Sequence, residues 1–203
     1  MHVVLREGRP DGLRLVLRSD VAVRPGSSLT LMRTVDDAAS APYEQVDVDR
    51  RIAAALADPG VEFVDREMTP GGHYAYRLSL EDPGGGVKTS APVEVAWRRP
   101  PGRPAHLAAV APTSAGVEVR WDAKPHLGAL VFRRDVLDRS ARPRRRAELG
   151  AGCDGIFFDR DVEPGGVYAY RVALARFDGG VVQYGTPSEE VYVTVPGEEG
   201  KQR

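Results

Sequence analysis

A sixteen-residue segment occurs twice in this chain, and this repetition constrains the fold more than any other feature. Residues 63–78 read FVDREMTPGGHYAYRL, and residues 157–172, ninety-four positions later, read FFDRDVEPGGVYAYRV, with ten identities in register. A period of that length is too long for a solenoid repeat but matches one small domain. The 203 residues therefore indicate two copies of one domain, each long enough to bury its own core.

The composition indicates a globular protein and no nucleic-acid partner. Hydrophobic residues make up 42% of the chain, charged residues make up 28%, and the net charge is −1. The first residues carry charge too early for a signal peptide, and no apolar run is long enough for a membrane span. The single Cys153 excludes an intrachain disulfide. We expect a protein of the cytoplasm or of an assembled particle, or an extracellular one if the chain is excised from a longer secreted protein.

Short stretches in which apolar and polar residues alternate dominate both halves. In residues 73–81, HYAYRLSLE, the tyrosines and leucines share one face, and residues 167–174 repeat the pattern. Turn sequences such as Pro-Gly-Gly and Asp-Gly-Gly separate these stretches at intervals of roughly 8–12 residues. Further strands are predicted over residues 13–17, 29–32, 93–97, 117–121, 130–132 and 191–195. Many short strands with one apolar face predict an all-β protein of antiparallel sandwiches.

Two segments interrupt the strand pattern. Residues 49–56, DRRIAAAL, predict a short helix that begins at an Asp cap and ends before an Asp-Pro-Gly sequence. Residues 99–104, RPPGRP, contain three prolines, which favour an extended and semi-rigid linker. We therefore predict a first domain over residues 1–98, the linker over 99–104, a second domain over 105–196 and a charged tail over 197–203.

The repeated segment resembles the part of fibronectin type III domains that joins strands E and F. In that family an apolar residue, a Pro two positions later and a Tyr four positions after that form a corner. The two copies here are Met68, Pro70 and Tyr74, and Val162, Pro164 and Tyr168. The resemblance implies two tandem immunoglobulin-like sandwiches of the fibronectin type III family, of bacterial or phage type. It also implies that each corner Tyr bonds to upstream backbone, which suits a buried hydroxyl group that needs a partner.

The resemblance covers nearly the whole chain, although the two halves differ. In the second half, Val117, Val119 and Trp121 are similar to the family's B strand with its core Trp. In the first half, Leu17 stands at the Trp position, and residues 36–60 form a long segment before the repeat. This segment is a candidate contact region, because insertions on a sandwich often carry contacts. The alternative is a loop variant that packs its own apolar residues.

The sequence contains no recognisable catalytic, cofactor or metal motif. The four histidines lack the spacing of a zinc site, and the Gly-rich stretches lack the Lys and the helix of a phosphate-binding loop. Asp65 and Asp159 recur at one position of the repeat, where a carboxylate is expected to cap backbone N–H groups. Cys153 is expected to be a semi-buried loop residue. We predict that the protein is not an enzyme and that it has no cofactor.

A run of arginines is the clearest candidate for recognition. Residues 139–146 read RSARPRRR, and the candidate contacts for an anionic partner are Arg139, Arg142, Arg144, Arg145 and Arg146. Guanidinium groups suit acidic protein faces, polyanionic glycans and lipid headgroups. The alternative is a solvated loop, partly balanced by Asp135, Asp138 and Glu148.

These observations predict a non-enzymatic structural or adaptor protein that acts through protein–protein contacts in a larger assembly. Self-association is one form of such contact, and sheet edges and loops are the expected surfaces. The leading hypothesis is a subunit of a phage tail or phage-tail-like particle. The alternative is a spacer or carbohydrate-associated accessory module excised from a secreted bacterial enzyme. A glycan-binding module is the third hypothesis, and it is disfavoured because the aromatic residues mostly fall on inward strand positions.

Overall fold

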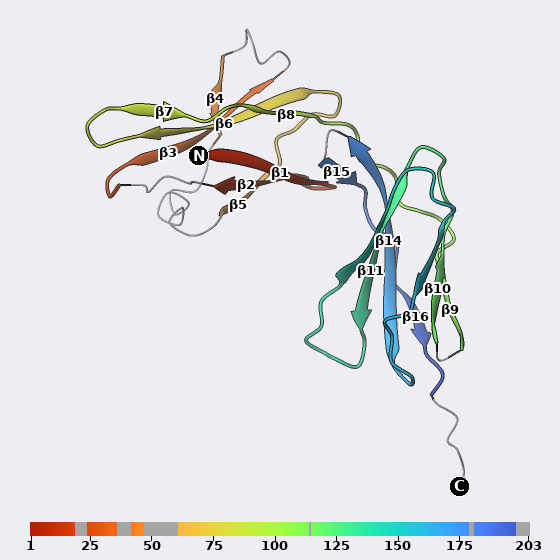
Figure 1. The fold of residues 1–203 in the computed structure, drawn as a ribbon. Coiled ribbons are helices and arrows are strands. Elements are labelled where there is room, and N and C mark those ends of the chain that lie inside the picture. Colours follow the sequence, from red (N-terminus) through yellow and green to blue (C-terminus); the bar gives the residue numbers. More distant parts are fainter. Residues whose placement is uncertain (19–23, 36–41, 47–60, 114, 179–180, 198–203) are drawn as a thin grey trace. The chain divides into compact units, whose positions relative to one another are not determined.

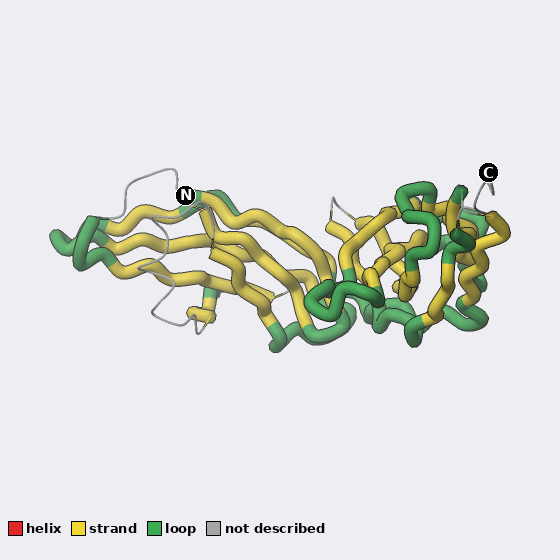
Figure 2. The backbone as a smooth tube through the Cα atoms, turned by 90° about the horizontal axis from the view of Figure 1, so that it is seen from below, coloured by secondary structure: helices red, strands yellow, loops and turns green. Residues whose placement is uncertain are grey.

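A computed structural model gives the fold of residues 1–18, 24–35, 42–46, 61–113, 115–178 and 181–197 (Figure 1). These residues form strands, turns and loops and contain no helix (Figure 2), so the described part has no helix that could cross a membrane. The chain divides into two compact units, Met1–Arg99 with Asp178–Val182, and Pro100–Phe177 with Gln183–Arg203. The all-β prediction is confirmed. The predicted helix over residues 49–56 lies outside the described residues.

The first unit has two antiparallel groups of strands around one core. Its strands are β1 (His2–Arg9), β2 (Gly12–Arg18), β3 (Ser28–Val35), β4 (Glu44–Val46), β5 (Val61–Asp65), β6 (His73–Glu81), β7 (Val87–Thr89) and β8 (Val93–Ala96). Strand β2 pairs with β1 and β5, while β3 pairs with β4 and β6, and β6 also pairs with β7 and β8. Alternate residues of β2, such as Leu13 and Leu15, are buried in one core with Tyr76 and Leu78 of β6.

The second unit repeats this pairing. Its strands are β9 (Ala108–Thr113), β10 (Gly116–Arg120), β11 (Gly128–Asp135), β12 (Arg144–Leu149), β13 (Ile156–Asp159), β14 (Val167–Asp178) and β16 (Val191–Thr194), and β15 spans Val181–Tyr184. Strand β10 pairs with β9 and β13, whereas β11 pairs with β12 and β14, and β14 also pairs with β16. Val117 and Val119 of β10 lie in one core with Tyr170 and Val172 of β14.

Each core contains one Trp, in a different strand position. Trp121 follows β10 and is buried, and its backbone N–H donates to Gly155 O at 2.9 Å. In the first unit Leu17 is buried at the matching position of β2. There the buried Trp97 follows β8 instead, and its N–H donates to Gly72 O at 2.9 Å. The two sandwiches are therefore filled by different side chains.

Candidate functional site: the outer face of β9, β10 and β13

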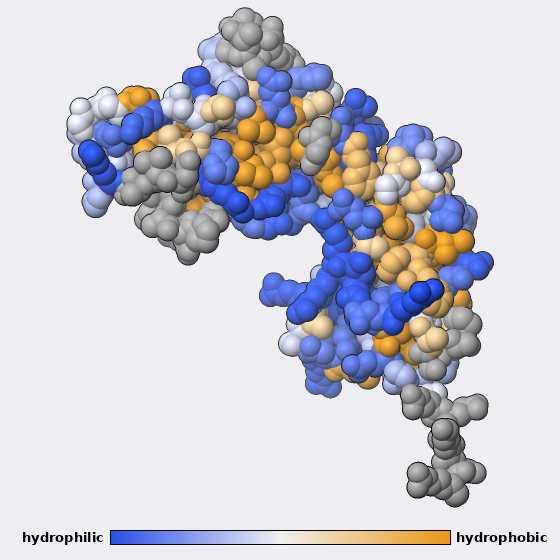
Figure 3. Space-filling model, viewed as in Figure 1, coloured by the Kyte–Doolittle hydropathy of each residue, from blue (hydrophilic) through white to orange (hydrophobic). Residues whose placement is uncertain are grey.

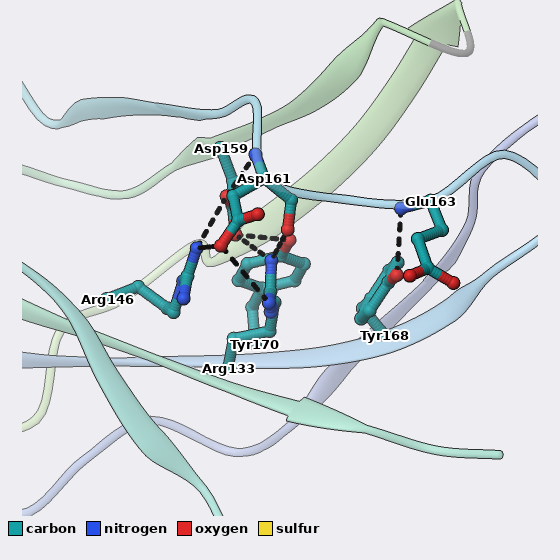
Figure 4. Close-up of polar contacts among 7 residues, drawn as sticks. All are labelled: Arg133, Arg146, Asp159, Asp161, Glu163, Tyr168 and Tyr170. Atoms are coloured by element: carbon teal, nitrogen blue, oxygen red, sulfur yellow. Dashed lines mark hydrogen bonds and ion pairs between the residues drawn. The ribbon is translucent and has the colours of Figure 1, made fainter. Parts of the chain in front are cut away.

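The buried carboxylate of Asp159 is the centre of a polar cluster in the second unit (Figure 4). Arg133 Nη1 donates to Asp159 Oδ2 at 3.0 Å, and the Tyr170 hydroxyl donates to the same oxygen at 2.9 Å. The backbone N–H of Asp161 donates to Asp159 Oδ1 at 3.1 Å. Burial and the neighbouring Asp159 charge raise the pKa of Tyr170 far above its usual range. A carboxylate that accepts this many bonds is fully used in holding strands together, so it is not available as a general base.

The same cluster occurs in the first unit around Asp65. Arg33 Nη1 lies 2.8 Å from Asp65 Oδ2, the Tyr76 hydroxyl donates to that oxygen at 2.7 Å, and Glu67 N–H donates to Oδ1 at 3.0 Å. The predicted cap of a backbone N–H is therefore confirmed in both units. The inward arginine was not predicted, although the sequence carries a signal for it. Arg33 continues the inward alternation of Leu31 into a core, where a charge requires a partner.

Tyr74 and Tyr168 are the second residues of β6 and β14, beside the corner that precedes each strand. The Tyr74 hydroxyl accepts a hydrogen bond from Thr69 N–H at 2.6 Å, and the Tyr168 hydroxyl accepts one from Glu163 N–H at 2.9 Å (Figure 4). Both hydroxyl groups thus bond backbone five residues upstream. This places an otherwise unpaired N–H of the corner in a hydrogen bond.

The Pro-Gly-Gly sequence of the first corner is explained by its turn. Pro70 holds the second turn position, Gly71 has a φ of 100°, and Gly72 N–H closes the turn on Thr69 O at 3.1 Å. A Cβ on Gly72 would lie 2.8 Å from the Tyr74 ring, so this glycine makes room for the tyrosine. Pro164 and its two following glycines repeat the arrangement, with Gly166 N–H bonded to Glu163 O.

The arginine run divides between a turn and a strand. Arg139 and Arg142 are exposed and form no hydrogen bond or ion pair with the described residues, whereas Arg145 pairs with Glu148 at 2.9 Å. Arg146 forms an ion pair with Asp161 and lies 3.7 Å from Asp159 Oδ1. The sequence leaves a solvated loop as the alternative to a contact site for this run. This is corrected for the last three arginines, which lie in the edge strand β12, where long charged side chains are tolerated.

A polar pocket of about 300 Å³ lies beside this run. Its charged lining residues are Arg133, Arg142, Arg144, Arg146, Asp135, Asp138, Asp161 and Glu163. Hydrogen bonds from Ser140 hold the pKa of Asp138 below its usual range, and the Arg146 guanidinium does the same for Asp161. Four acidic groups therefore oppose four arginines, and the lining has no excess of positive charge. Contact of this run with an anionic partner stays a prediction.

The remaining candidate ligands are scattered. His73 is exposed on β6, and His106 Nδ1 lies 2.7 Å from the exposed carboxylate of Asp122. Cys153 is partly buried against the second core. Within the described ranges, no three His, Cys, Asp or Glu side chains are grouped so that they could hold a metal ion.

Three large apolar side chains are exposed on the outer face of the sheet of β9, β10 and β13. Val110 is 53% exposed, Ile156 is 43% exposed and Phe158 is 40% exposed. Their strand neighbours Ala109 and Phe157 pack against the core, so the alternation of the strands turns these three outward. Hydrophobic side chains gather over β9 and β10 in Figure 3. An apolar cluster of this kind is typical of an interaction surface. We call these three residues the apolar triplet.

The register orders this face into two rows across the sheet. Glu118 of the central strand lies between Val110 and Phe158, and Arg120 lies between Ala108 and Ile156. Glu118 and Arg120 form an ion pair, in which the arginine side chain is 63% exposed and the carboxylate side chain is 24% exposed. The face therefore combines an apolar surround with one charge of each sign at its centre.

Two adjacent phenylalanines in the sequence indicate this face. Phe157 and Phe158 are consecutive residues of β13, a strand that was not among those predicted, and consecutive strand residues point to opposite faces. Phe157 packs against the core, so Phe158 must point outward. The expectation that aromatic residues mostly face inward does not hold for Phe158.

The corresponding face of the first unit is covered by ion pairs. Arg14 lies opposite Val64 on this face, as Glu118 lies opposite Phe158 in the second unit. Arg14 Nε donates to Glu62 Oε2 at 3.1 Å, and Arg14 Nη1 lies 3.4 Å from Glu7 Oε1. Glu62 stands where the second unit has Ile156. The repeated fold thus presents a charged face in one unit and an apolar face in the other.

Comparisons with known proteins find likeness at the level of structure. A scan against protein-family models finds no matching family, and a search of curated proteins finds no match. Among solved structures, the chicken CNTN1 FN1-FN3 domains match with a TM-score of 0.54 and 14% identity. The match covers 96% of this chain and 66% of that one, so this chain spans just under two thirds of the length of its structural neighbour.

A second similar structure is the third fibronectin III domain of the human KIAA0343 protein. Its TM-score is 0.42 at 18% identity, over 51% of this chain and 89% of that chain. At these identities the likeness concerns the fold. The prediction of tandem immunoglobulin-like sandwiches is confirmed by the antiparallel pairing in each unit and by the CNTN1 neighbour. This chain therefore has the fold of tandem fibronectin type III domains.

Proposed function

We propose that this chain is a non-enzymatic structural or adaptor protein that acts through protein–protein contacts. The observation that carries the proposal is the apolar triplet, Val110, Ile156 and Phe158, on an open sheet face of the second unit. A single exposed apolar residue needs no explanation, but three on one face form an apolar surface whose contact with water is unfavourable. The fold supports the proposal, because such sandwiches commonly serve as contact modules.

The polar groups of the two units support the same proposal, because they are less suited to bind a partner than the apolar triplet. Asp65 and Asp159, which sit in the repeated motif, are both saturated by structural bonds. The exposed arginines face a balanced set of carboxylates. Compared with these groups, the apolar triplet is exposed on an open sheet face, so it is the better candidate for a contact surface.

Two narrower settings are hypotheses within this proposal. One is a subunit of a phage tail or phage-tail-like particle, with the chain in the cytoplasm or in the particle. The other is a spacer or carbohydrate-associated module of a secreted bacterial enzyme, with the chain outside the cell. The reading frame that encodes the chain distinguishes them. A catalytic domain and a signal peptide in the same frame would favour the second setting, and tail genes beside it would favour the first.

Site-specific photo-cross-linking tests the proposed contact surface. A photoreactive phenylalanine analogue replaces Phe158 in the chain, which is expressed in the organism that encodes it. The matched control carries the analogue at Val64, which occupies the same register position in the first unit. The proposal expects a discrete protein adduct from position 158 and a much weaker one from position 64. The absence of any adduct from position 158 would overturn the proposed contact surface.

A further inference from the structure

We infer that the partner of the apolar face is a second copy of this chain, packed face to face about a twofold axis. This inference rests on the proposed function, and it names the partner of the same surface. In the arrangement the two copies place their central β10 strands antiparallel across the contact. The axis lies in the interface, perpendicular to β10, and passes between Glu118 and Arg120. An interface of this kind is closed and uses the same patch twice.

The two central charges select this arrangement. Glu118 and Arg120 lie two residues apart on β10 and point to the same outer face. A twofold axis along β10 would place Glu118 against its own copy, and Arg120 likewise, which is unfavourable. An axis across β10 places Glu118 of each copy against Arg120 of the other. The four groups then alternate in sign, and such a network is worth more than a single exposed pair.

The apolar residues are self-complementary under the same operation. The row of Val110, Glu118 and Phe158 comes to lie on the row of Ala108, Arg120 and Ile156 of the other copy. The larger Val110 therefore faces the small Ala108, and the ring of Phe158 faces the aliphatic Ile156. Pairing a large residue with a small one lets the two faces approach closely. Twisted sheets packed in this way cross at about 30°, which centres the contact on β10.

Phe158 is already held in one position in the single copy. Its ring lies over Gly116, because a Cβ built on that glycine would lie 2.5 Å from the Phe158 Cε1 atom. The Arg160 guanidinium carbon lies over the same ring, 5.6 Å from its centre. A side chain that is ordered before binding loses less conformational entropy in the complex. This favours Phe158 as the anchor of the contact.

The first unit cannot pair with itself in the same way. The equivalent axis would pass between Arg14 and Val16, the counterparts of Glu118 and Arg120. Arg14 already binds Glu7 and Glu62, and Val16 is buried within the single chain, so neither position is open to a second copy. Burying an ion-pair network against apolar groups carries a desolvation penalty of several kcal/mol. The same fold thus gives one self-complementary face and one that is not.

Charge reversal tests the arrangement directly by sedimentation velocity across a concentration series. Glu118→Arg and Arg120→Glu each make the two central positions alike in sign, so each is expected to weaken self-association by roughly tenfold or more, since about 1.4 kcal/mol is a factor of ten. The double variant Glu118→Arg/Arg120→Glu restores the alternation and is expected to associate within about threefold of the unmodified chain. An equimolar mixture of the two single variants is expected to form a heterodimer.

A second set of variants separates this contact from general effects on folding. Phe158→Arg is expected to abolish self-association, whereas Val64→Arg at the matching position of the first unit leaves it unchanged. Thermal melts verify that each variant is folded. Single reversals that associate as well as the unmodified chain, or a mixture that fails to associate, would overturn the twofold arrangement.

The outcomes also distinguish this inference from the proposed function. A chain that stays monomeric at every concentration, together with an adduct from position 158 to a different protein, overturns the self-contact and leaves the contact function intact. The absence of an adduct from position 158 overturns both. A dimer that the double variant restores supports both.

Discussion

The two units of this chain share their interior and differ on their outer faces. Each interior has a buried Asp that binds an inward Arg and an inward Tyr, and each has a corner Tyr bonded to backbone five residues upstream. On the outer face of the sheet that contains β2 or β10, Arg14 binds two glutamates in one unit, and the apolar triplet is exposed in the other. Folding fixes the interior, whereas the outer face is free to carry different functions.

The largest expected effect tests whether the two interiors are energetically equal. Asp159→Asn and Asp65→Asn each leave an inward arginine without its carboxylate, so each should lower the free energy of unfolding of its unit by about 3–5 kcal/mol. Trp97 reports on the first unit and Trp121 on the second, because each is buried in its own core. Urea titrations on chains that carry one Trp, with the other changed to Phe, would follow each unit separately.

The control for this pair of variants is Asp161→Asn. Asp161 also contacts Arg133 and Arg146, but its side chain is 79% exposed, so its loss should have a small effect. An equal loss of stability for Asp161→Asn and Asp159→Asn would contradict the central role of the buried carboxylate. Different losses of unfolding free energy for Asp65→Asn and Asp159→Asn would show that the two interiors are not energetically equal.

The corner tyrosines are expected to contribute next. Tyr74→Phe and Tyr168→Phe remove the acceptors of Thr69 N–H and Glu163 N–H, and each should destabilise its unit by about 1–3 kcal/mol. The same single-Trp titrations measure the effect. If both variants unfold at the same urea concentration as the parent chain, the corner bonds do not contribute to stability.

The first glycines of β2 and β10 should differ in their response to alanine. A Cβ on Gly12, whose φ is 144°, would lie 2.1 Å from Asp65 O, so Gly12→Ala should destabilise the first unit by about 2–3 kcal/mol. A Cβ on Gly116 would lie 2.5 Å from the Phe158 ring and 2.8 Å from Asp159 O, but Gly116 does not have a positive φ, so Gly116→Ala should destabilise the second unit less, by about 1–2 kcal/mol. Urea titrations decide the order. If Gly116→Ala proved more destabilising than Gly12→Ala, the groups around Gly116, including the Phe158 ring, would be less able to move than the backbone beside Gly12.

The smallest expected effect is a pH dependence of stability that arises from Glu190 and is confined to the second unit. Glu190 accepts hydrogen bonds from Arg134 Nη2 at 2.9 Å and from the Tyr192 hydroxyl at 2.7 Å, which lowers its pKa from 4.5 to about 2. Since this pKa is lowered in the folded state, the stabilisation is complete above pH 4.5 and is lost as the pH falls toward 2. Pro92 and Thr34 replace Glu190 and Arg134 in the first unit.

Thermal melts between pH 2 and 7 would measure this difference. The melting temperature of the second unit should fall more steeply below pH 4.5 than in a Glu190→Gln variant. Parallel pH profiles for the two chains would show that the Glu190 cluster does not contribute to the acid sensitivity.

Much of the fold could be predicted because the repeated segment contains both the strand alternation and the turn residues that define it. The alternation in residues 73–81 and 167–174 placed Tyr76 and Tyr170 inside, and the Pro-Gly-Gly turns placed the corner. The candidate site was harder to find. The inward arginines, Arg33 and Arg133, lie far from their carboxylates in sequence and on the opposite sheet, so only the packing of the two sheets against each other brings them close.

The sequence by itself determined the all-β class, the two copies and the corners, because these depend on local alternation and on turn residues. Only the tertiary structure decided which outward residues share a face. Val110 and Phe158 are 48 positions apart and share a face only because β10 pairs with both of their strands. The arginine run is prominent in the sequence, but the fold sets carboxylates against it. A surface is assembled across strands, so its chemistry depends on register, which no single segment contains.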